Sequence, residues 1–397
     1  MTSGTSSVLF CACYGAKRVQ KAAVAAALDV LSSGETEFLA AADLCELAAT
    51  RSPVLAELAK RSELQIAACA PRAVAALFAF ADAPLAAGKA RALDITSCAA
   101  QETQAALANP GEQWESLPAM PSSAAPAARY IRPRTPRRLV ALHEPRGQAL
   151  DSARRRELCQ ALIEEGFHVF RAVNGTAQEL LDRLRPVRLL VKSGGSVEGK
   201  KSGVLAVQGR PIEDILAALR EAAGDGGPQE PWLAWYPAMD LSRCVDCGQC
   251  LQFCLFGVFA ADEAGRVRVV APDHCKPNCP ACARVCPEGA ILFPKYPSGP
   301  INGAEAEEAA GEAARVDLAS LIQGDVHRLL RERSERARKR FSLDRSRAEA
   351  ERERCRCMQE SLGNAPLPDP AALKAAIQRR LDQLHPRPDA PKQPPTQ

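Results

Sequence analysis

Two runs of cysteine decide the fold around them: CVDCGQCLQFC at residues 244–254 and CKPNCPACARVC at residues 275–286. The first run has the spacing C-x2-C-x2-C-x3-C, and the second differs only by one extra residue in its first gap. Three cysteines spaced this closely wrap a loop around one cuboidal iron–sulfur cluster, and we expect the fourth to begin a helix that points away. The two runs therefore predict two cluster-binding halves of one module.

Structural zinc and a disulfide framework are the alternatives for these cysteines. A zinc site takes four ligands per ion in paired C-x2-C knuckles and has no use for a third cysteine two residues later. A disulfide framework is typical of small secreted domains, whereas eight of the 16 cysteines of this 397-residue chain are concentrated in one short stretch. The pattern favours two [4Fe-4S] clusters in a reducing compartment.

Over residues 235–297 the sequence resembles the two-cluster bacterial-type ferredoxins. The flanking sequences WYPAMD and AILFP fit outer strands, and GVFAADEAGRVRVV fits a hairpin between the cysteine runs. Pro287 follows the last cysteine as that family prefers, whereas Leu255 stands where the first half should also have proline. The resemblance implies a pseudo-two-fold β-α-β repeat in which the fourth cysteine of each run reaches the other cluster. One cluster is then held by Cys244, Cys247, Cys250 and Cys286, and the other by Cys275, Cys279, Cys282 and Cys254.

The first 115 residues show short apolar runs that alternate with Ala- and Leu-rich helical stretches. Apolar runs at 8–10, 64–68 and 90–95 predict strands of a small α/β domain. Several cysteines follow such runs, and the carboxyl ends of parallel strands form one sheet edge where ligands bind. Burial as small apolar side chains is the alternative. The candidate third site consists of Cys11, Cys13, Cys45, Cys69 and Cys98.

This N-terminal segment resembles the N-terminal domain of the flavin-bearing subunit of heterodisulfide reductase. The resemblance rests on the C-x-C at 11–13 and the AAC-x-P-R segment at 67–72. The mid-domain Cys45 and the later Cys98 extend it. It implies electron transfer inside a multisubunit oxidoreductase and a third iron–sulfur cluster. The flavin domain of that family is not expected, because no G-x-G-x-x-G follows a strand.

Residues 116–136 are rich in Pro, Ser and Ala and predict a linker to a second small α/β domain at 137–225. Near its end, SGVLAVQGR at 202–210 looks like part of a hairpin. GGSVEGK at 194–200 nearly matches a phosphate-binding loop, but Lys201 stands where Ser or Thr should bind magnesium. A hairpin turn is therefore favoured over a nucleotide site.

The cysteine module, placed at 232–300, is followed by a charged helical region and a disordered tail at 301–397. Arginine alternates with glutamate at 331–340, which favours a solvated or partner helix over nucleic-acid binding. The predicted fold class is therefore α/β and α+β multidomain. Two small α/β domains precede a ferredoxin-like 2[4Fe-4S] β-α-β repeat and a helical, partly disordered C-terminal tail.

Composition narrows the function. A hydrophobic content of 47%, a charged content of 25% and a net charge of +4 predict no nucleic-acid or membrane partner. No window holds the roughly 18 apolar residues of a membrane span, and the N-terminus lacks a secretory signal pattern, so we expect a cytoplasmic protein. No catalytic base, oriented nucleophile or nicotinamide fingerprint is recognisable.

We therefore expect an iron–sulfur electron-transfer subunit of a heterodisulfide-reductase-like oxidoreductase complex, rather than a free-standing enzyme. Its partners would be redox proteins, most simply other oxidoreductase subunits. Two hypotheses from other classes remain open. In one, the N-terminal cysteines sense redox state and the protein is regulatory. In the other, they exchange with a disulfide substrate, and the protein is a thiol/disulfide oxidoreductase.

Overall fold

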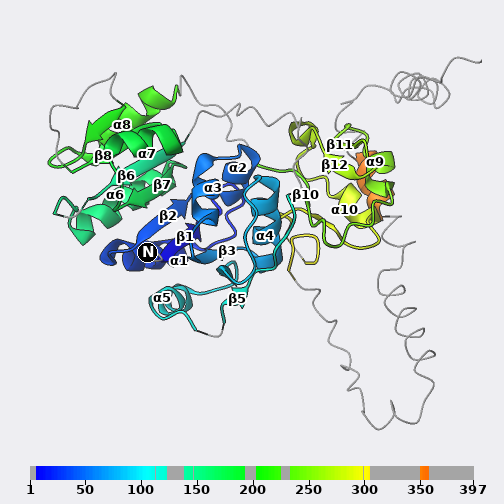
Figure 1. The fold of residues 1–397 in the computed structure, drawn as a ribbon, viewed down its shortest axis with the longest axis horizontal. Coiled ribbons are helices and arrows are strands. Elements are labelled where there is room, and N and C mark those ends of the chain that lie inside the picture. The colour runs from blue at the N-terminus through cyan, green and yellow to red at the C-terminus, as the bar shows by residue number, and fades with distance from the viewer. Residues whose placement is uncertain are drawn as a thin grey trace, which may run out of the picture.

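The computed structural model describes residues 6–111, 113–122, 138–145, 147–192, 203–224, 233–297, 299–304 and 349–356. At its centre lies one nine-stranded sheet in the order β5-β4-β3-β1-β2-β7-β6-β8-β9 (Figure 1). The cysteine module, drawn in yellow, lies beside α4 of this sheet layer (Figure 1). Three predictions fall outside the described residues, wholly or for the most part: the loop at 194–200, the linker at 116–136 and the C-terminal region at 301–397.

The N-terminal segment forms four parallel strands, three of them at the predicted apolar runs, whereas the second strand matches no predicted run. They are β1 (Ser6–Cys11), β2 (Glu37–Ala41), β3 (Glu63–Ala68) and β4 (Ala90–Asp94). Leu9 and Phe10 are fully buried in core clusters on opposite faces of the sheet, which is why these strands are continuous apolar runs. A short antiparallel strand, β5 (Glu115–Ser116), ends this side of the sheet. Leu117 and Met120, in the predicted linker, are buried beside it.

The second segment adds four strands to the same sheet. They are β6 (Leu139–His143), β7 (His168–Ala172), β8 (Arg188–Val191) and β9 (Val204–Ala206), and all pair in parallel with one another. The hairpin expected at 202–210 is wrong, because β9 lies parallel to β8. Val204 and Leu205 pack into cores on opposite faces, so β9 is a two-sided strand of a parallel sheet.

The two α/β segments expected as separate domains share this sheet. They meet where β2 pairs antiparallel with β7, with Leu39 opposite Phe170 and Ala40 opposite Val169. All four side chains are buried. Each segment also pairs the backbone groups of a strand edge that the other segment alone would leave unpaired. The boundaries at 1–115 and 137–225 stay a prediction, but the strands on either side belong to one structure.

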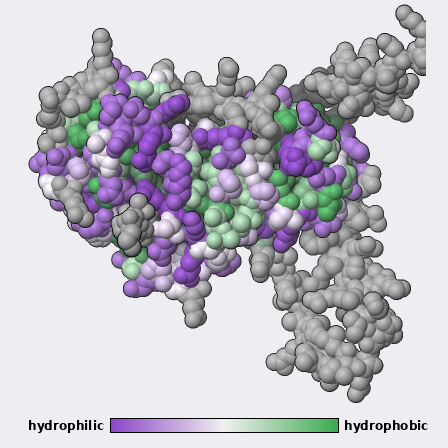
Figure 2. Space-filling model, in the orientation of Figure 1, coloured by the Kyte–Doolittle hydropathy of each residue, from purple (hydrophilic) through white to green (hydrophobic). Residues whose placement is uncertain are grey.

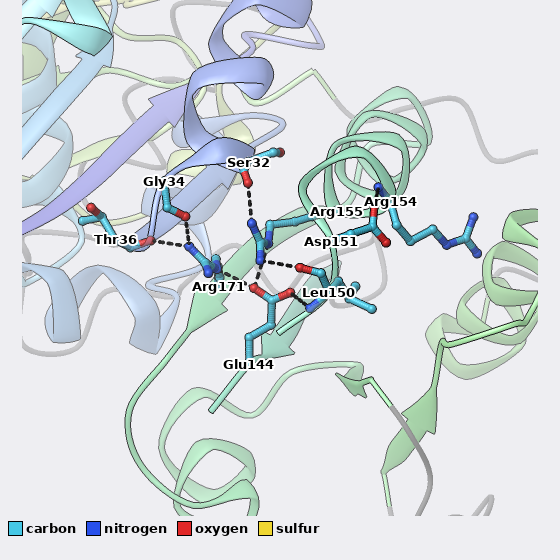
Figure 3. Close-up of polar contacts among 9 residues, drawn as sticks. All are labelled: Ser32, Gly34, Thr36, Glu144, Leu150, Asp151, Arg154, Arg155 and Arg171. Carbon is cyan, nitrogen blue, oxygen red and sulfur yellow. Dashed lines mark hydrogen bonds and ion pairs between the residues drawn. The ribbon is translucent and has the colours of Figure 1, made fainter. Parts of the chain in front are cut away.

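A buried ion network strengthens this junction (Figure 3). Oε2 of Glu144 accepts hydrogen bonds from Nε of Arg155 at 2.8 Å and from Nε of Arg171 at 2.5 Å. Arg171 also donates to the carbonyl of Gly34 at 2.7 Å, and Arg155 donates to the carbonyl of Ser32. Both arginines lie in the second segment and both carbonyls in the first, so the network joins the two halves of the sheet.

Helices cover both faces. On one face lie α1 (Lys21–Ser33), α5 (Ala100–Ala108), α6 (Ser152–Glu164) and α8 (Ile212–Ala223). On the other face lie α2 (Leu44–Ala49), α3 (Pro53–Ala59), α4 (Pro71–Phe80) and α7 (Ala177–Leu184). The architecture is therefore a three-layer α/β fold. None of the helices in the described part of the chain is long and apolar enough to cross a membrane.

The cysteine module runs strand, helix, strand, twice. Its elements are β10 (Ala238–Met239), α9 (Gln249–Phe253), β11 (Phe259–Ala261), β12 (Val267–Val269), a 3-10 helix (Pro272–His274), α10 (Ala281–Val285) and β13 (Ile291–Leu292). The outer strands β10 and β13 pair, and β11 and β12 form a hairpin, which confirms both predictions from the flanking sequences. One hydrophobic core continues from Leu9 of the sheet to Cys282 of the module, so the module is packed on the sheet layer.

Candidate metal centres

Each predicted ligand set lines one pocket of the module. The first pocket holds about 340 Å³ of empty space, open solvent included, and the second about 400 Å³. In each pocket three cysteines come from one run and the fourth comes from the other. The structure thus brings the eight predicted cysteines together in two groups of four. Cys244, Cys247, Cys250 and Cys286 line the first pocket, and Cys254, Cys275, Cys279 and Cys282 line the second.

Left-handed backbone turns wrap the cysteine loops. Asp246 and Gly248 have φ of +50° and +71° in the first loop, and Asn278 has φ of +62° in the second. Glycine and the short polar residues are the ones that adopt this conformation most easily. The turns bring cysteines that are three or four positions apart in sequence around one shared space.

The fourth cysteine of each run ends a short helix, whereas the sequence suggested that it would begin one. Cys254 caps the C-terminus of α9 with extended backbone, and Cys286 caps α10 in the same way. The N–H of Cys254 donates to the carbonyl of Cys250 at 3.0 Å, so the third and fourth cysteines lie one helical turn apart. The chain then leaves the helix toward the other pocket.

The chemistry of the pockets fits an iron–sulfur cluster. Burial, with Cys286 as the next cause, raises the pKa of Cys250 to about 12, and burial raises the pKa of Cys282 well above its ordinary value. Such thiols become ligands when a metal displaces the proton. No three Cys, His, Asp or Glu side chains in the described part of the chain could hold one metal ion. A [4Fe-4S] cluster does not need several ligands around one ion. It needs four thiolates around a shared space, one for each iron.

Four of the five N-terminal cysteines gather at the carboxyl edge of the sheet, and we name them the sheet-edge cysteines: Cys11, Cys13, Cys45 and Cys69. Cys11 ends β1, Cys45 lies in the first turn of α2, and Cys69 follows β3. Burial is the largest cause of their raised pKa values, which for Cys69 reaches about 12. Cys13 raises the pKa of each of the other three further, so the four thiols are close neighbours.

Cys98 does not join this group. It packs against the core on the opposite face of the sheet, and its Sγ lies 3.5 Å from the carbonyl of Asp94. Burial raises its pKa, followed by the charges of Glu102 and Asp94. Cys98 follows β4 at the same edge of the sheet, but none of the other four cysteines is among the groups that shift its pKa, so the structure groups four of the five predicted residues.

A buried ion pair from the module lies beside the sheet-edge cysteines. Nζ of Lys295, three residues after β13, donates to Oδ2 of Asp43, the N-cap residue of α2. Burial alone would lower the pKa of Lys295, but Asp43 and then Cys45 raise it above its ordinary value. A Cβ on Gly15 would lie 3.1 Å from both charged groups, so a larger residue there would press on the pair.

Tyr236 connects the sheet edge with the second pocket. Its hydroxyl donates to the carbonyl of Cys45 at 2.7 Å, and its ring centroid lies 4.7 Å from that of Phe80 on α4. The next residue, Pro237, lines the second pocket. One short segment of backbone thus separates the sheet-edge cysteines from a pocket of the module.

Further contacts fix the module on the sheet layer. Nε of Arg72, on α4, donates to Oδ2 of Asp240 at 2.8 Å, and its Nη2 donates to the carbonyl of Gly289 at 2.6 Å. Nη1 of Arg18 donates to the carbonyl of Pro294 at 2.8 Å. Sequence reasoning missed these partners and the ion pair between Asp43 and Lys295. These residues lie more than 160 positions from their partners, so no local pattern in the sequence indicates the contacts.

Comparison with known proteins finds relatives of the module. An uncharacterized ferredoxin of Methanocaldococcus jannaschii is 44% identical over 69 residues, which are 17% of this chain and 46% of that ferredoxin. A second ferredoxin of that organism is 36% identical over 57 residues, 14% of this chain and 73% of the relative. Subunit PorD of its pyruvate synthase is 37% identical over 60 residues, 15% of this chain and 67% of the PorD chain. The chain thus spans less than half of the first relative. No family model and no solved structure matches it.

Proposed function

Because this chain belongs to the ferredoxins through its cysteine module, we propose that it is an electron carrier with two [4Fe-4S] clusters, one in each pocket. The observation that carries this proposal is the lining of the pockets, each with three cysteines of one run and the fourth of the other. That exchange is the arrangement of two-cluster ferredoxins. The resemblance to ferredoxins in sequence and the grouping of cysteines in space support the same proposal independently.

The residues of the chain hold and shield the clusters. The eight thiolates of the two pockets would bind the irons, and each cluster supplies one-electron chemistry when it is bound. Met239 and Ile291 help to line the first pocket, and Phe253 and Phe259 help to line the second. Apolar walls keep water away from iron and sulfide, and they hold the cysteines in place when the charge changes.

We propose that the carrier is a subunit of a cytoplasmic oxidoreductase complex of the heterodisulfide reductase type. The resemblance of the N-terminal segment and the similarity to PorD of a pyruvate synthase support oxidoreductase partners. The first pocket offers a route to such a partner, because Cys247 is exposed and the neighbouring Val245 is 62% exposed. At the end of the molecule formed by the module, apolar and hydrophilic side chains lie next to one another (Figure 2). Such mixed surfaces are typical of transient interfaces.

Iron and acid-labile sulfide analysis of anaerobically purified protein tests the proposal. We expect the two pockets to hold about eight irons per chain, and each of the variants Cys286→Ser and Cys254→Ser to hold about four fewer than the unaltered chain, because each removes one ligand of one cluster. Cys355→Ser is the matched control, since Cys355 is exposed and lines neither pocket. A content below about four irons in the unaltered chain would refute the proposal.

The grouping of the sheet-edge cysteines beside Asp43 and Lys295 favours a further redox centre there, in addition to the two pockets. A third cluster would raise the iron content to about 12 per chain, and Cys69→Ser would bring it back to about eight. Cys98→Ser should leave it unchanged, because Cys98 lies on the other face. Rapid disulfide exchange or redox sensing at the sheet-edge cysteines is less favoured. Reactive thiols have a lowered pKa, whereas burial raises the pKa of the sheet-edge thiols. A content of about eight irons, unaffected by Cys69→Ser, would contradict the third cluster.

A further inference from the structure

A short helix from the C-terminal region lies against the cysteine module. The described residues 349–356 are helical and are drawn in orange beside α9 and α10 (Figure 1). Arg284 of α10 holds them with two ion pairs, from Nη1 to Oε2 of Glu349 at 2.8 Å and from Nε to Oε1 of Glu353 at 2.9 Å. Ala350, which belongs to this helix, is fully buried. The helix is therefore docked on the module, in contact with the elements that carry the cysteines.

This helix brings a cation to the second pocket. Arg354 lines that pocket together with its four cysteines, and its guanidinium carbon lies 5.0 Å from the ring centroid of Phe253. Phe253 precedes Cys254, one of the four. The Nε of Arg354 is buried and makes no hydrogen bond within the described part of the chain. A guanidinium with a buried, unused Nε–H donor at the wall of a pocket is suited to a ligand of negative charge.

The first pocket has the opposite charge. Its lining includes Asp246 and Glu288 and, among the described residues, no lysine or arginine. Oδ1 of Asp246 lies 3.6 Å from Sγ of Cys244, so a carboxylate borders the sulfur atoms themselves. The two pockets, alike in their cysteines, thus differ in the sign of the charge beside them.

We propose that the helix 349–356 caps the second pocket and that Arg354 makes the cluster there the easier of the two to reduce. This inference rests on the proposed function. A cluster that accepts one electron becomes more negative by one charge. A cation nearby stabilises the reduced form, and a carboxylate disfavours it. One electron therefore moves from the cluster in the first pocket, which is oxidised, to the cluster in the second pocket, which is reduced.

Redox titration of the full-length, cluster-loaded chain, followed by low-temperature EPR, tests this inference. We expect two midpoint potentials, and Arg354→Gln should lower only the higher one. The expected change is about tenfold in the ratio of reduced to oxidised cluster, or about 59 mV for one electron. Arg354→Lys, which keeps the charge, should retain most of the difference. Arg352→Gln is the matched control, because Arg352 is exposed on the same helix and lines neither pocket.

The outcomes separate the inference from the proposed function. If the protein holds two clusters but Arg354→Gln shifts neither potential, shifts both equally, or acts like Arg352→Gln, the role of Arg354 is refuted and the carrier function stands. If the iron content is below about four per chain, both are refuted. A selective fall of the higher potential, with partial rescue by lysine, supports the inference.

Discussion

At the scale of single residues, His168 shows what burial does to a titratable group. It opens β7, is 2% exposed, and its Nδ1 has no hydrogen-bond partner in the described structure. Burial is the largest cause that lowers its pKa from 6.5 to about 4, and the charge of Arg138 lowers it too. The charge of Asp43 raises the pKa but does not outweigh burial. The folded protein therefore keeps the ring neutral, while the unfolded chain takes up a proton below about pH 6.5. The stability that the neutral His168 ring contributes is fully present above that pH and is lost as the pH falls from 6.5 toward 4.

The variant His168→Phe should remove this pH dependence. Between pH 7 and pH 5 the unaltered protein should lose about 2 kcal/mol of unfolding free energy more than the variant, because its unfolded state is protonated in that window. Urea unfolding at the two pH values measures the loss of unfolding free energy in each protein. Because the unaltered protein and the variant carry the same clusters, the difference between their losses cancels the acid sensitivity of the clusters. Equal losses in both chains would show that His168 is not the group responsible.

At the scale of elements, the junction of β2 and β7 depends on the ion network of Glu144. Arg171 and Glu144 are fully buried, and Arg171 also donates to the carbonyl of Thr36 at 3.1 Å. A buried charge that loses its partner is costly, whereas a solvated pair contributes little. Removing one partner of the network should therefore destabilise the junction more than removing one partner of a surface ion pair.

Arg171→Met should lower the free energy of unfolding by about 3 kcal/mol, because it leaves Glu144 with one arginine and Thr36 without its donor. Arg183→Met is the matched control. Arg183 pairs with Glu57 at 3.1 Å and is 46% exposed, so its loss should cost below about 1 kcal/mol. Chemical denaturation of both variants checks the prediction. Similar costs for the two would mean that the network does not stabilise the junction.

At the scale of the whole molecule, the module and the sheet layer are packed through α4. Gly303, in the segment that follows the module, has φ of +93°, and a Cβ there would lie 2.8 Å from Cβ of Ala73. Ala73 is fully buried on α4, so neither backbone can move away freely. This close approach makes Gly303 a sensitive probe of how the two parts fit.

Gly303→Ala should therefore destabilise the protein by about 2 to 4 kcal/mol, the sum of a strained backbone and an overpacked contact. Gly265→Ala is the matched control, since Gly265 has φ of +76° and no atom within 4 Å of its added Cβ. That change should cost only about 1 kcal/mol. Thermal unfolding monitored by circular dichroism compares them. If the two glycines respond alike, the contact with Ala73 is not a tight one.

The features that depend on short spacing were predictable from the amino-acid sequence alone. The cysteine runs predicted that three cysteines of each run share one site, because ligands three or four positions apart occupy one loop. The crossing of the fourth cysteine to the other site followed from the resemblance to two-cluster ferredoxins. The strands at 8–10, 64–68 and 90–95 were predictable too, because apolar runs bounded by helical stretches fit a sheet covered on both faces. In the same way, the sequences around β11 and β12 predicted their hairpin.

How these parts meet follows from the fold and from no local pattern in the sequence. The fold joined two predicted domains into one sheet, placed Cys98 apart from the sheet-edge cysteines, and set Lys295 beside Asp43 and Arg354 beside the second pocket. The physical reason is that strand edges and buried charges choose partners by complementarity across hundreds of residues, which leaves no local period or spacing in the sequence. The identity of the cysteine module was therefore local information, whereas its charge environment and its support came from the fold.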